Sequence, residues 1–101
     1  MIVFVRSVRT IRGKRGVAKK WAIKLTDYIN AQCPETQCRV FIPRFGELSW
    51  IYWQTEFEDI AALDAWQQKM AADPGYRELG NQAQDLFSQE SIKDMVWASL
   101  T

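Results

Sequence analysis

A ligand pocket is the first chemistry that the residue types of this sequence could support. The 101 residues include five Trp, three Tyr and five Phe. Small-molecule sites are mostly apolar, with a few polar groups that converge on the ligand. The candidate rings are Tyr28, Trp53, Phe57, Trp66 and Tyr76, and the candidate hydrogen-bonding groups are Arg6, Asn30, Arg39 and Gln54. The alternative is that the rings fill the core and an interface, and the apolar helix stripe that carries Trp66 favours a core position.

A basic segment at the start of the sequence could hold an anion. Residues 1–24 contain eight lysines and arginines and no acidic residue. Arg12, Lys14 and Arg15 lie just before a predicted helix, whose N-terminus favours a phosphate or carboxylate group. The alternative is a basic corner that meets acidic side chains elsewhere in the fold or in a dimer.

The loop Gly13-Lys14-Arg15-Gly16 also resembles the G-x-x-G loop of KH domains, which clamps a nucleic-acid backbone. A KH loop joins two helices, whereas residues 1–11 have the pattern of a strand. Nucleic-acid binding is therefore the least favoured function for this segment.

The sequence contains few of the residues that metal binding and nucleophilic catalysis require. The chain has no histidine and only two cysteines, so we expect neither a metal site nor a nucleophile–base triad. Cys33 and Cys38 flank a turn that contains Pro34, and we expect two reduced, partly buried thiols, with a local disulfide as the alternative. Glu58 and Asp59 precede a predicted helix, where negative charge is stabilising, so we assign them a structural role.

Residues 48–57 must position several of the candidate pocket residues. As a strand, this segment places rings on both of its faces. One face carries Trp50, Tyr52, Gln54 and Glu56, and the other carries Ser49, Ile51, Trp53, Thr55 and Phe57. Helices of the same chain can cover only one face, so we expect a second copy of the protein to cover the other.

The remaining pattern predicts a ferredoxin-like α+β fold within a single domain, 1–101. Period-two segments predict strands at 1–11, 38–42 and 91–100, and helical spacing predicts helices at 17–29 and 60–70. Asp73-Pro74-Gly75 interrupts the second helical region, which continues at 76–87. The order β-α-β-β-α-β places the helices on one face of an antiparallel sheet. No segment has the length of a signal peptide or membrane helix, so we expect a cytoplasmic protein.

The aromatic strand continues into residues 57–66, which begin Phe-Glu-Asp and carry Trp66, and then into the 70–76 segment with its Asp-Pro-Gly turn. This order of elements resembles that of proteins in the dimeric α/β-barrel superfamily, in particular its NIPSNAP-like and antibiotic-biosynthesis-monooxygenase-like branches. The resemblance implies a homodimeric α/β barrel with a pocket between sheet and helices in each subunit. Some members are cofactor-free oxygenases of polycyclic aromatic substrates. The haem-binding members use a histidine ligand, which this chain lacks, so we expect no cofactor.

The function that follows is a small-molecule-binding protein or an enzyme, with a cofactor-free monooxygenase of an aromatic substrate as the enzymatic form. Such an enzyme assists deprotonation of its substrate and stabilises the resulting oxyanion. Arg6, Asn30 and Gln54 are the candidate catalytic groups for these two tasks. The alternatives are a non-catalytic structural or partner-binding dimer and, last, a nucleic-acid-binding protein.

Overall fold

Four strands form one antiparallel sheet in the computed structural model, which describes residues 1–101. They are β1 (Ile2–Arg9), β2 (Arg39–Phe41), β3 (Trp50–Phe57) and β4 (Lys93–Ala98). Their order is β2-β3-β1-β4, so β1 and β3 lie in the centre and β4 forms one edge. β-branched and aromatic residues dominate the two central strands, which have neighbours on both sides.

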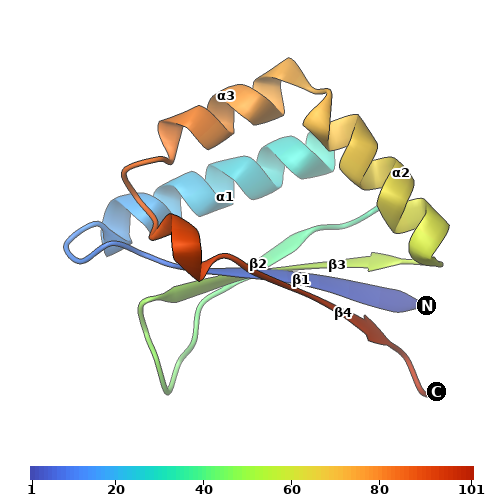
Figure 1. The fold of residues 1–101 in the computed structure, drawn as a ribbon, viewed down its shortest axis with the longest axis horizontal. Coiled ribbons are helices and arrows are strands. Elements are labelled where there is room, and N and C mark those ends of the chain that lie inside the picture. Colours follow the sequence, from blue (N-terminus) through green and yellow to red (C-terminus); the bar gives the residue numbers. More distant parts are fainter.

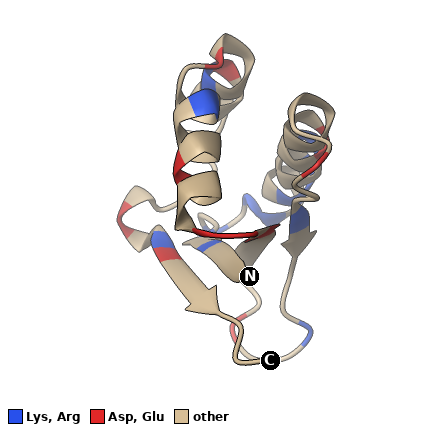
Figure 2. Cartoon of the chain, turned by 90° about the vertical axis from the view of Figure 1, so that its right-hand side faces the viewer, with Lys and Arg blue, Asp and Glu red and all other residues tan.

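Three helices cover a single face of this sheet (Figure 1). They are α1 (Arg15–Gln32), α2 (Ile60–Ala71) and α3 (Pro74–Gln82). Viewed from the side, all of them stand over the same face, and no helix lies against the opposite one (Figure 2). The predicted α+β class, the ferredoxin-like element order and the broken second helical region are therefore confirmed. None of the helices is both long and apolar enough to cross a membrane.

The bend between α2 and α3 has a clear local cause. Asp73 caps α3, because its Oδ1 accepts hydrogen bonds from the amides of Gly75 at 2.8 Å and Tyr76 at 3.1 Å. The same oxygen accepts a 2.6 Å hydrogen bond from the Tyr28 hydroxyl of α1. A Cβ atom at Gly75 would overlap the Tyr28 ring and hydroxyl, so only glycine allows this close approach. The Asp-Pro-Gly segment thus fastens the bend to α1.

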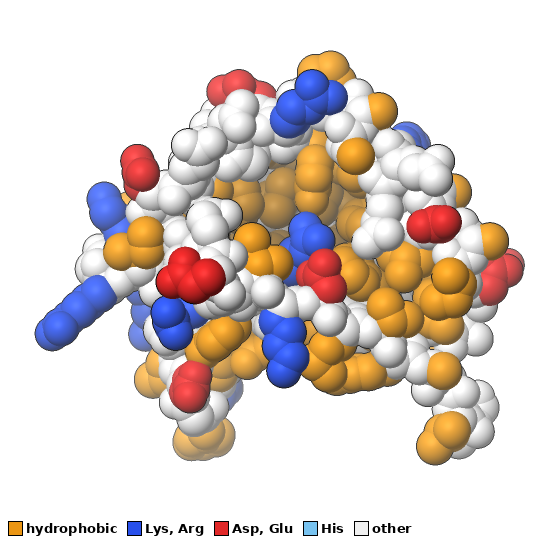
Figure 3. Space-filling view, viewed as in Figure 1, with side chains coloured by type: hydrophobic (Ala, Val, Ile, Leu, Met, Phe, Trp, Pro, Cys, Tyr) orange, Lys and Arg blue, Asp and Glu red, His pale blue; other side chains and the backbone are white.

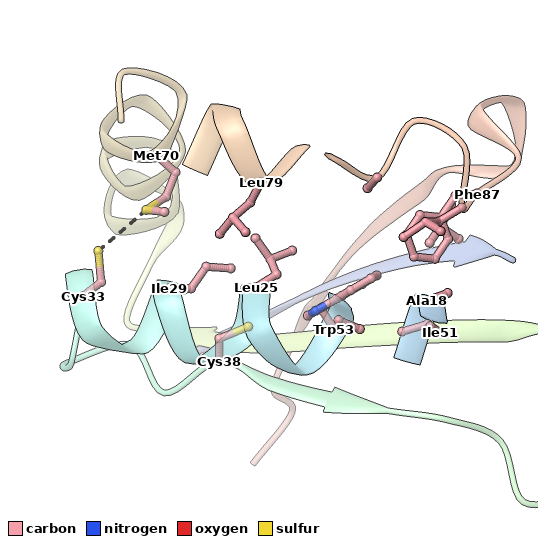
Figure 4. Packing of buried hydrophobic residues seen from close by; sticks show 14 residues of the cluster. Ala18, Leu25, Ile29, Cys33, Cys38, Ile51, Trp53, Met70, Leu79 and Phe87 are labelled. Atoms are coloured by element: carbon pink, nitrogen blue, oxygen red, sulfur yellow. Dashed lines mark hydrogen bonds between the residues drawn. The ribbon is translucent and has the colours of Figure 1, made fainter. Parts of the chain in front are cut away.

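The core lies between the helices and the inner face of the sheet, which is the face they cover (Figure 4). Ile51 and Trp53 of β3 are buried there against the small residues Ala18 and Ala22 of α1. The hydroxyl of Thr26 accepts a 3.1 Å hydrogen bond from the Trp53 indole and donates to the Ala22 carbonyl oxygen at 2.8 Å. The inner face of β3 is thereby fixed to α1 by packing and by a satisfied polar pair.

The ends of several elements differ from the predicted boundaries. α3 ends at Gln82, whereas the sequence predicts a helix through 87, and a short 3₁₀ helix, η1 (Gln89–Ser91), precedes β4. The chain leaves the helix because Phe87 forms a bridge with Thr10 and becomes buried. The amide of Ser88 also donates to the Arg9 carbonyl oxygen at 2.9 Å. Tertiary contacts at the end of β1 therefore override the helical spacing.

Candidate functional site

A pocket of about 200 Å³ lies between the inner face of the sheet and the helices. The space-filling view shows it as a hollow with hydrophobic side chains in its depth and charged side chains at its rim (Figure 3). The apolar lining residues come from β1, β3, all three helices and the segment that follows them: Phe4, Val8, Trp21, Leu25, Ile29, Trp53, Trp66, Tyr76, Ala83, Phe87 and Ile92. The polar lining residues are Arg6, Cys38, Thr55 and Gln89.

Rings in edge-to-face contact form one wall of the pocket. The ring centroids of Trp21 and Phe87 lie 5.3 Å apart, and those of Trp21 and Trp53 lie 6.2 Å apart. On the other side, Trp66 packs against Phe4 at 6.1 Å and against Phe57 at 5.5 Å. Such packing holds the rings in fixed positions, so the pocket has a preformed wall.

The hydrogen-bonding state of the lining tryptophans differs from ring to ring. The Trp21 indole donates to the Leu79 carbonyl oxygen at 2.9 Å, and the Trp53 indole donates to Thr26. The indole N–H of Trp66 is buried and has no acceptor. A buried donor without a partner costs about 1–3 kcal/mol, so Trp66 is a lining residue with an unsatisfied polar group.

A charged pair lies beside the apolar lining. Arg6 donates to both carboxylate oxygens of Asp94, with Nε–Oδ1 at 2.7 Å and Nη2–Oδ2 at 2.8 Å. These hydrogen bonds raise the pKa of Arg6, and desolvation by burial opposes the shift. Each side chain is 40% exposed, so the pair is partly open to solvent. Tyr76, which also lines the pocket, is near enough to raise the Arg6 pKa further.

The two cysteines lie apart from each other in the core. Both thiols are free and buried. Cys38 lines the pocket, where burial raises the pKa of its thiol and a hydrogen bond with Thr55 opposes the shift. Cys33 instead contacts the Met70 sulfur at 3.9 Å (Figure 4). A protonated, enclosed thiol is a poor nucleophile.

The structure brings four of the predicted site residues together around this pocket and places five elsewhere. Arg6, Trp53, Trp66 and Tyr76 line it. Arg39, Gln54 and Phe57 line a separate open groove of about 600 Å³ at the edge of the sheet. Asn30 is used structurally, because it donates to the Cys38 carbonyl oxygen at 2.9 Å and accepts from the Cys38 amide at 2.7 Å. Tyr28 belongs to the bend with Asp73.

Several lining residues were absent from the sequence-based site. Phe4, Phe87 and Gln89 line the pocket, and Asp94 holds Arg6. Asp94 lies directly opposite Arg6 in the β1–β4 ladder. The alternation of β1 does place Phe4 and Arg6 on the same face, and this signal could have predicted Phe4.

The predicted anion-binding residues divide between two positions. Arg12 and Arg15 line a third hollow at the turn from β1 to α1. Lys14 is exposed and is the N-cap residue of α1, outside the lining of that hollow.

Fold and pocket together define a ferredoxin-like α+β protein with a ring-lined pocket between its sheet and its helices. No protein-family model and no curated protein matches the sequence. Among solved structures, a NIPSNAP domain protein from Burkholderia xenovorans is similar, with a TM-score of 0.84, 19% identity, and coverage of 100% of this chain and 96% of that chain.

Two further structures extend the comparison. A NIPSNAP family protein from Agrobacterium tumefaciens has a TM-score of 0.79 and 19% identity over 96% of this chain and 90% of that chain. A candidate antibiotic biosynthesis monooxygenase from Nitrosomonas europaea has a TM-score of 0.76 and 11% identity over 100% of both chains. The resemblance drawn from the sequence is thus confirmed at the level of fold. A shared fold does not by itself carry a shared activity.

Proposed function

We propose that the protein binds a small, largely apolar molecule in the pocket between sheet and helices. The observation that carries this proposal is the mostly apolar, ring-lined pocket, in which one lining residue, Trp66, has a buried indole N–H without an acceptor in the protein. The rest of the lining is mostly rings and aliphatic side chains, which favour an apolar ligand. A ligand oxygen that accepts from Trp66 would satisfy the unpaired donor.

The pocket volume sets the size of this ligand. A dry, apolar cavity of about 150 Å³ is known to hold a molecule of benzene. The pocket here measures about 200 Å³, so it has room for one aromatic ring with a short substituent. A ligand with several fused rings requires the pocket to widen.

A matched pair of ligands tests the proposal. Acetophenone has one ring and one acceptor oxygen, and ethylbenzene has a similar shape without the oxygen. We expect acetophenone to bind about fivefold more tightly, because one net hydrogen bond contributes ~1 kcal/mol. The ¹H–¹⁵N spectrum reports both binding and the indole N–H signal of Trp66.

The control for this experiment is Trp66→Phe, which keeps a ring and removes the donor. In this variant the preference for acetophenone should disappear, while ethylbenzene should bind as before. If neither ligand shifts the signals of the pocket residues, the pocket is a packing defect and the non-catalytic structural dimer becomes the better description.

The outer face of the sheet, which no helix covers, supports a homodimer. Phe41, Met95 and Trp97 lie on it and are exposed by 45%, 36% and 51%. Apolar side chains gathered on one face favour association with another molecule, and a two-fold axis allows each copy to cover the other. Sedimentation at micromolar concentration should therefore give twice the 11.8 kDa mass of the chain. A single 11.8 kDa species would contradict this part of the proposal.

Cofactor-free oxygenation is a second candidate function for the same pocket. Structures with this fold include candidate antibiotic biosynthesis monooxygenases, and the pocket offers two donors, Arg6 and the Trp66 indole. In such a reaction an activated CH₂ group of the substrate loses a proton and the carbanion reduces O₂. The CH₂ group becomes a carbonyl and one molecule of water leaves. Arg6 and Trp66 would stabilise the oxyanion.

Oxygen consumption with anthrone tests this second candidate. We expect one O₂ to be consumed per anthrone, with at least a tenfold lower rate for Arg6→Gln because a donor to the oxyanion is lost. Anthrone has three fused rings, so its turnover also requires the pocket to open near the Arg6–Asp94 pair. No oxygen uptake would remove the oxygenase candidate and leave the binding proposal untouched.

A further inference from the structure

The third hollow, of about 460 Å³, lies at the turn where β1 leads into α1. Three arginines line it, Arg9, Arg12 and Arg15, together with the backbone of Gly13 and the hydroxyl-bearing Thr10 and Ser49. No acidic residue lines the hollow. Its chemistry is therefore opposite to that of the apolar pocket under the helices.

The arginines of this hollow form no ion pair within the protein. The only ion pair of the structure is Arg6–Asp94. Arg15 has a buried Nε with no hydrogen-bond acceptor. The Arg9 guanidinium donates a long hydrogen bond, of 3.3 Å, to the Ser88 hydroxyl. The hydrogen bond from Ser88, and to a lesser extent the charge of Arg9, lower the pKa of the nearby Glu90. Acidic side chains of the same protomer therefore meet the basic segment at Arg6 and Arg9, whereas Arg12 and Arg15 form no ion pair.

The start of α1 adds further donors to the same place. Its N-cap residue, Lys14, makes no side-chain capping bond, and its first turn contains no acidic residue. The first amide groups of an 18-residue helix are therefore left without the usual side-chain acceptor. Gly13, with a φ of +85°, makes the tight turn that brings this helix end beside the arginines.

We propose that this hollow binds an oxyanion group, a phosphate or carboxylate, of a small molecule. Guanidinium groups offer paired N–H donors that match two oxygens of such an anion. An anion would lower the repulsion among the three like charges that line the hollow. This site is independent of the apolar pocket, because the two linings share no residue.

Titration of the whole protein with inorganic phosphate tests the proposal. The ¹H–¹⁵N spectrum reports the arginine Nε–H groups and the amides of Gly13 and Gly16. We expect saturable shifts of these signals with phosphate and none with chloride at the same ionic strength. Acetate in a parallel titration shows whether a carboxylate is accepted as well.

Three single substitutions, each of which removes one positive charge, locate the site. Arg12→Gln and Arg15→Gln should each weaken phosphate binding at least fivefold. Lys24→Gln is the matched control, because Lys24 is exposed on α1 and lies about 13 Å further along that helix. Arg12 is itself exposed, so its substitution keeps the test valid even if Arg15→Gln disturbs the fold.

Two results would overturn the proposal. One is a shift that does not saturate, or one that all three variants weaken equally, which would indicate a general salt effect. The other is salt-dependent binding of single-stranded RNA that Arg12→Gln weakens, without any binding of phosphate itself. That result would assign the corner to nucleic acid.

Discussion

The two faces of the sheet carry similar side chains and differ in what covers them. On the inner face, Trp53 is 8% exposed and its neighbour Ile51 is 1% exposed. On the outer face, Trp97 is 51% exposed and Met95 is 36% exposed. The content of aromatic and aliphatic side chains therefore does not determine which face of the sheet is buried. The elements packed against each face determine it.

Hydrogen bonding sharpens the difference between the faces. The inner-face indole of Trp53 is satisfied by Thr26 of α1. On the outer face, Trp50 donates at 2.6 Å to Glu47, three residues earlier and exposed. The indole on the inner face is thus satisfied by a distant helix, whereas the Trp50 indole on the outer face uses a local partner. The two faces therefore differ in which elements of the chain hold their rings in place.

The largest expected effect comes from Trp53→Ala on the inner face. The substitution removes a buried ring that packs against Trp21 and Phe87 and leaves the Thr26 hydroxyl without its donor. Loss of a buried Trp typically costs about 3–5 kcal/mol of unfolding free energy. Urea denaturation measures this loss.

The matched substitution on the outer face is Trp97→Ala. At concentrations low enough for the protein to be monomeric, it should lower the unfolding free energy by less than about 1 kcal/mol, as surface substitutions usually do. If the two variants lose equal stability under these conditions, the distinction between the faces is wrong.

A smaller effect is expected from Gly75→Ala at the bend that sets the position of α3 over the inner face. The new methyl group would overlap Tyr28, and such overpacking costs about 1–3 kcal/mol. Gly80→Ala is the control, since a Cβ there meets no atom within 4 Å and removes a flexible residue from α3. Thermal unfolding should show a lower midpoint for the first variant and an unchanged or higher one for the second.

The sequence was sufficient to predict the local features of both faces. It was not sufficient to predict the contacts that depend on pairing between strands. Alternation along residues 50–57 divided the rings of β3 correctly between two faces without showing which face the helices cover, and the Asp-Pro-Gly segment located the break between α2 and α3. The partner of Arg6 could not be predicted, because Asp94 is 88 residues away and meets it only through the β1–β4 register. Asn30 was misplaced for a related reason. Its amide is held by the backbone of Cys38, a contact that no spacing rule describes.

Association through the outer face should respond to Trp97→Ser. Exposed tryptophans at the centre of an interface often contribute 2 kcal/mol or more to binding, so we expect the dimer dissociation constant to rise at least tenfold. Sedimentation over a dilution series measures this constant. Phe45→Ser is the control, because Phe45 is exposed in the β2–β3 connection, outside the sheet. An unchanged constant for Trp97→Ser would show that the dimer, if formed, uses another surface.

The smallest expected effect is on the pH dependence of the unfolding free energy, through Asp73 at the bend between α2 and α3. The hydrogen bond from Tyr28, and then those from the Tyr76 and Gly75 amides, lower the pKa of Asp73. A carboxyl whose pKa is lower in the folded state stabilises the fold above its unfolded pKa, which is about 4. This contribution is lost as the pH falls through the folded value. Asp73→Asn keeps an acceptor for the helix cap and removes the charge, so its unfolding free energy should fall less steeply than that of the parent protein between pH 4 and pH 2. Parallel acid-denaturation curves for the two proteins would show that the Tyr28–Asp73 contact is not formed in solution, and the bend over the inner face would then need another explanation.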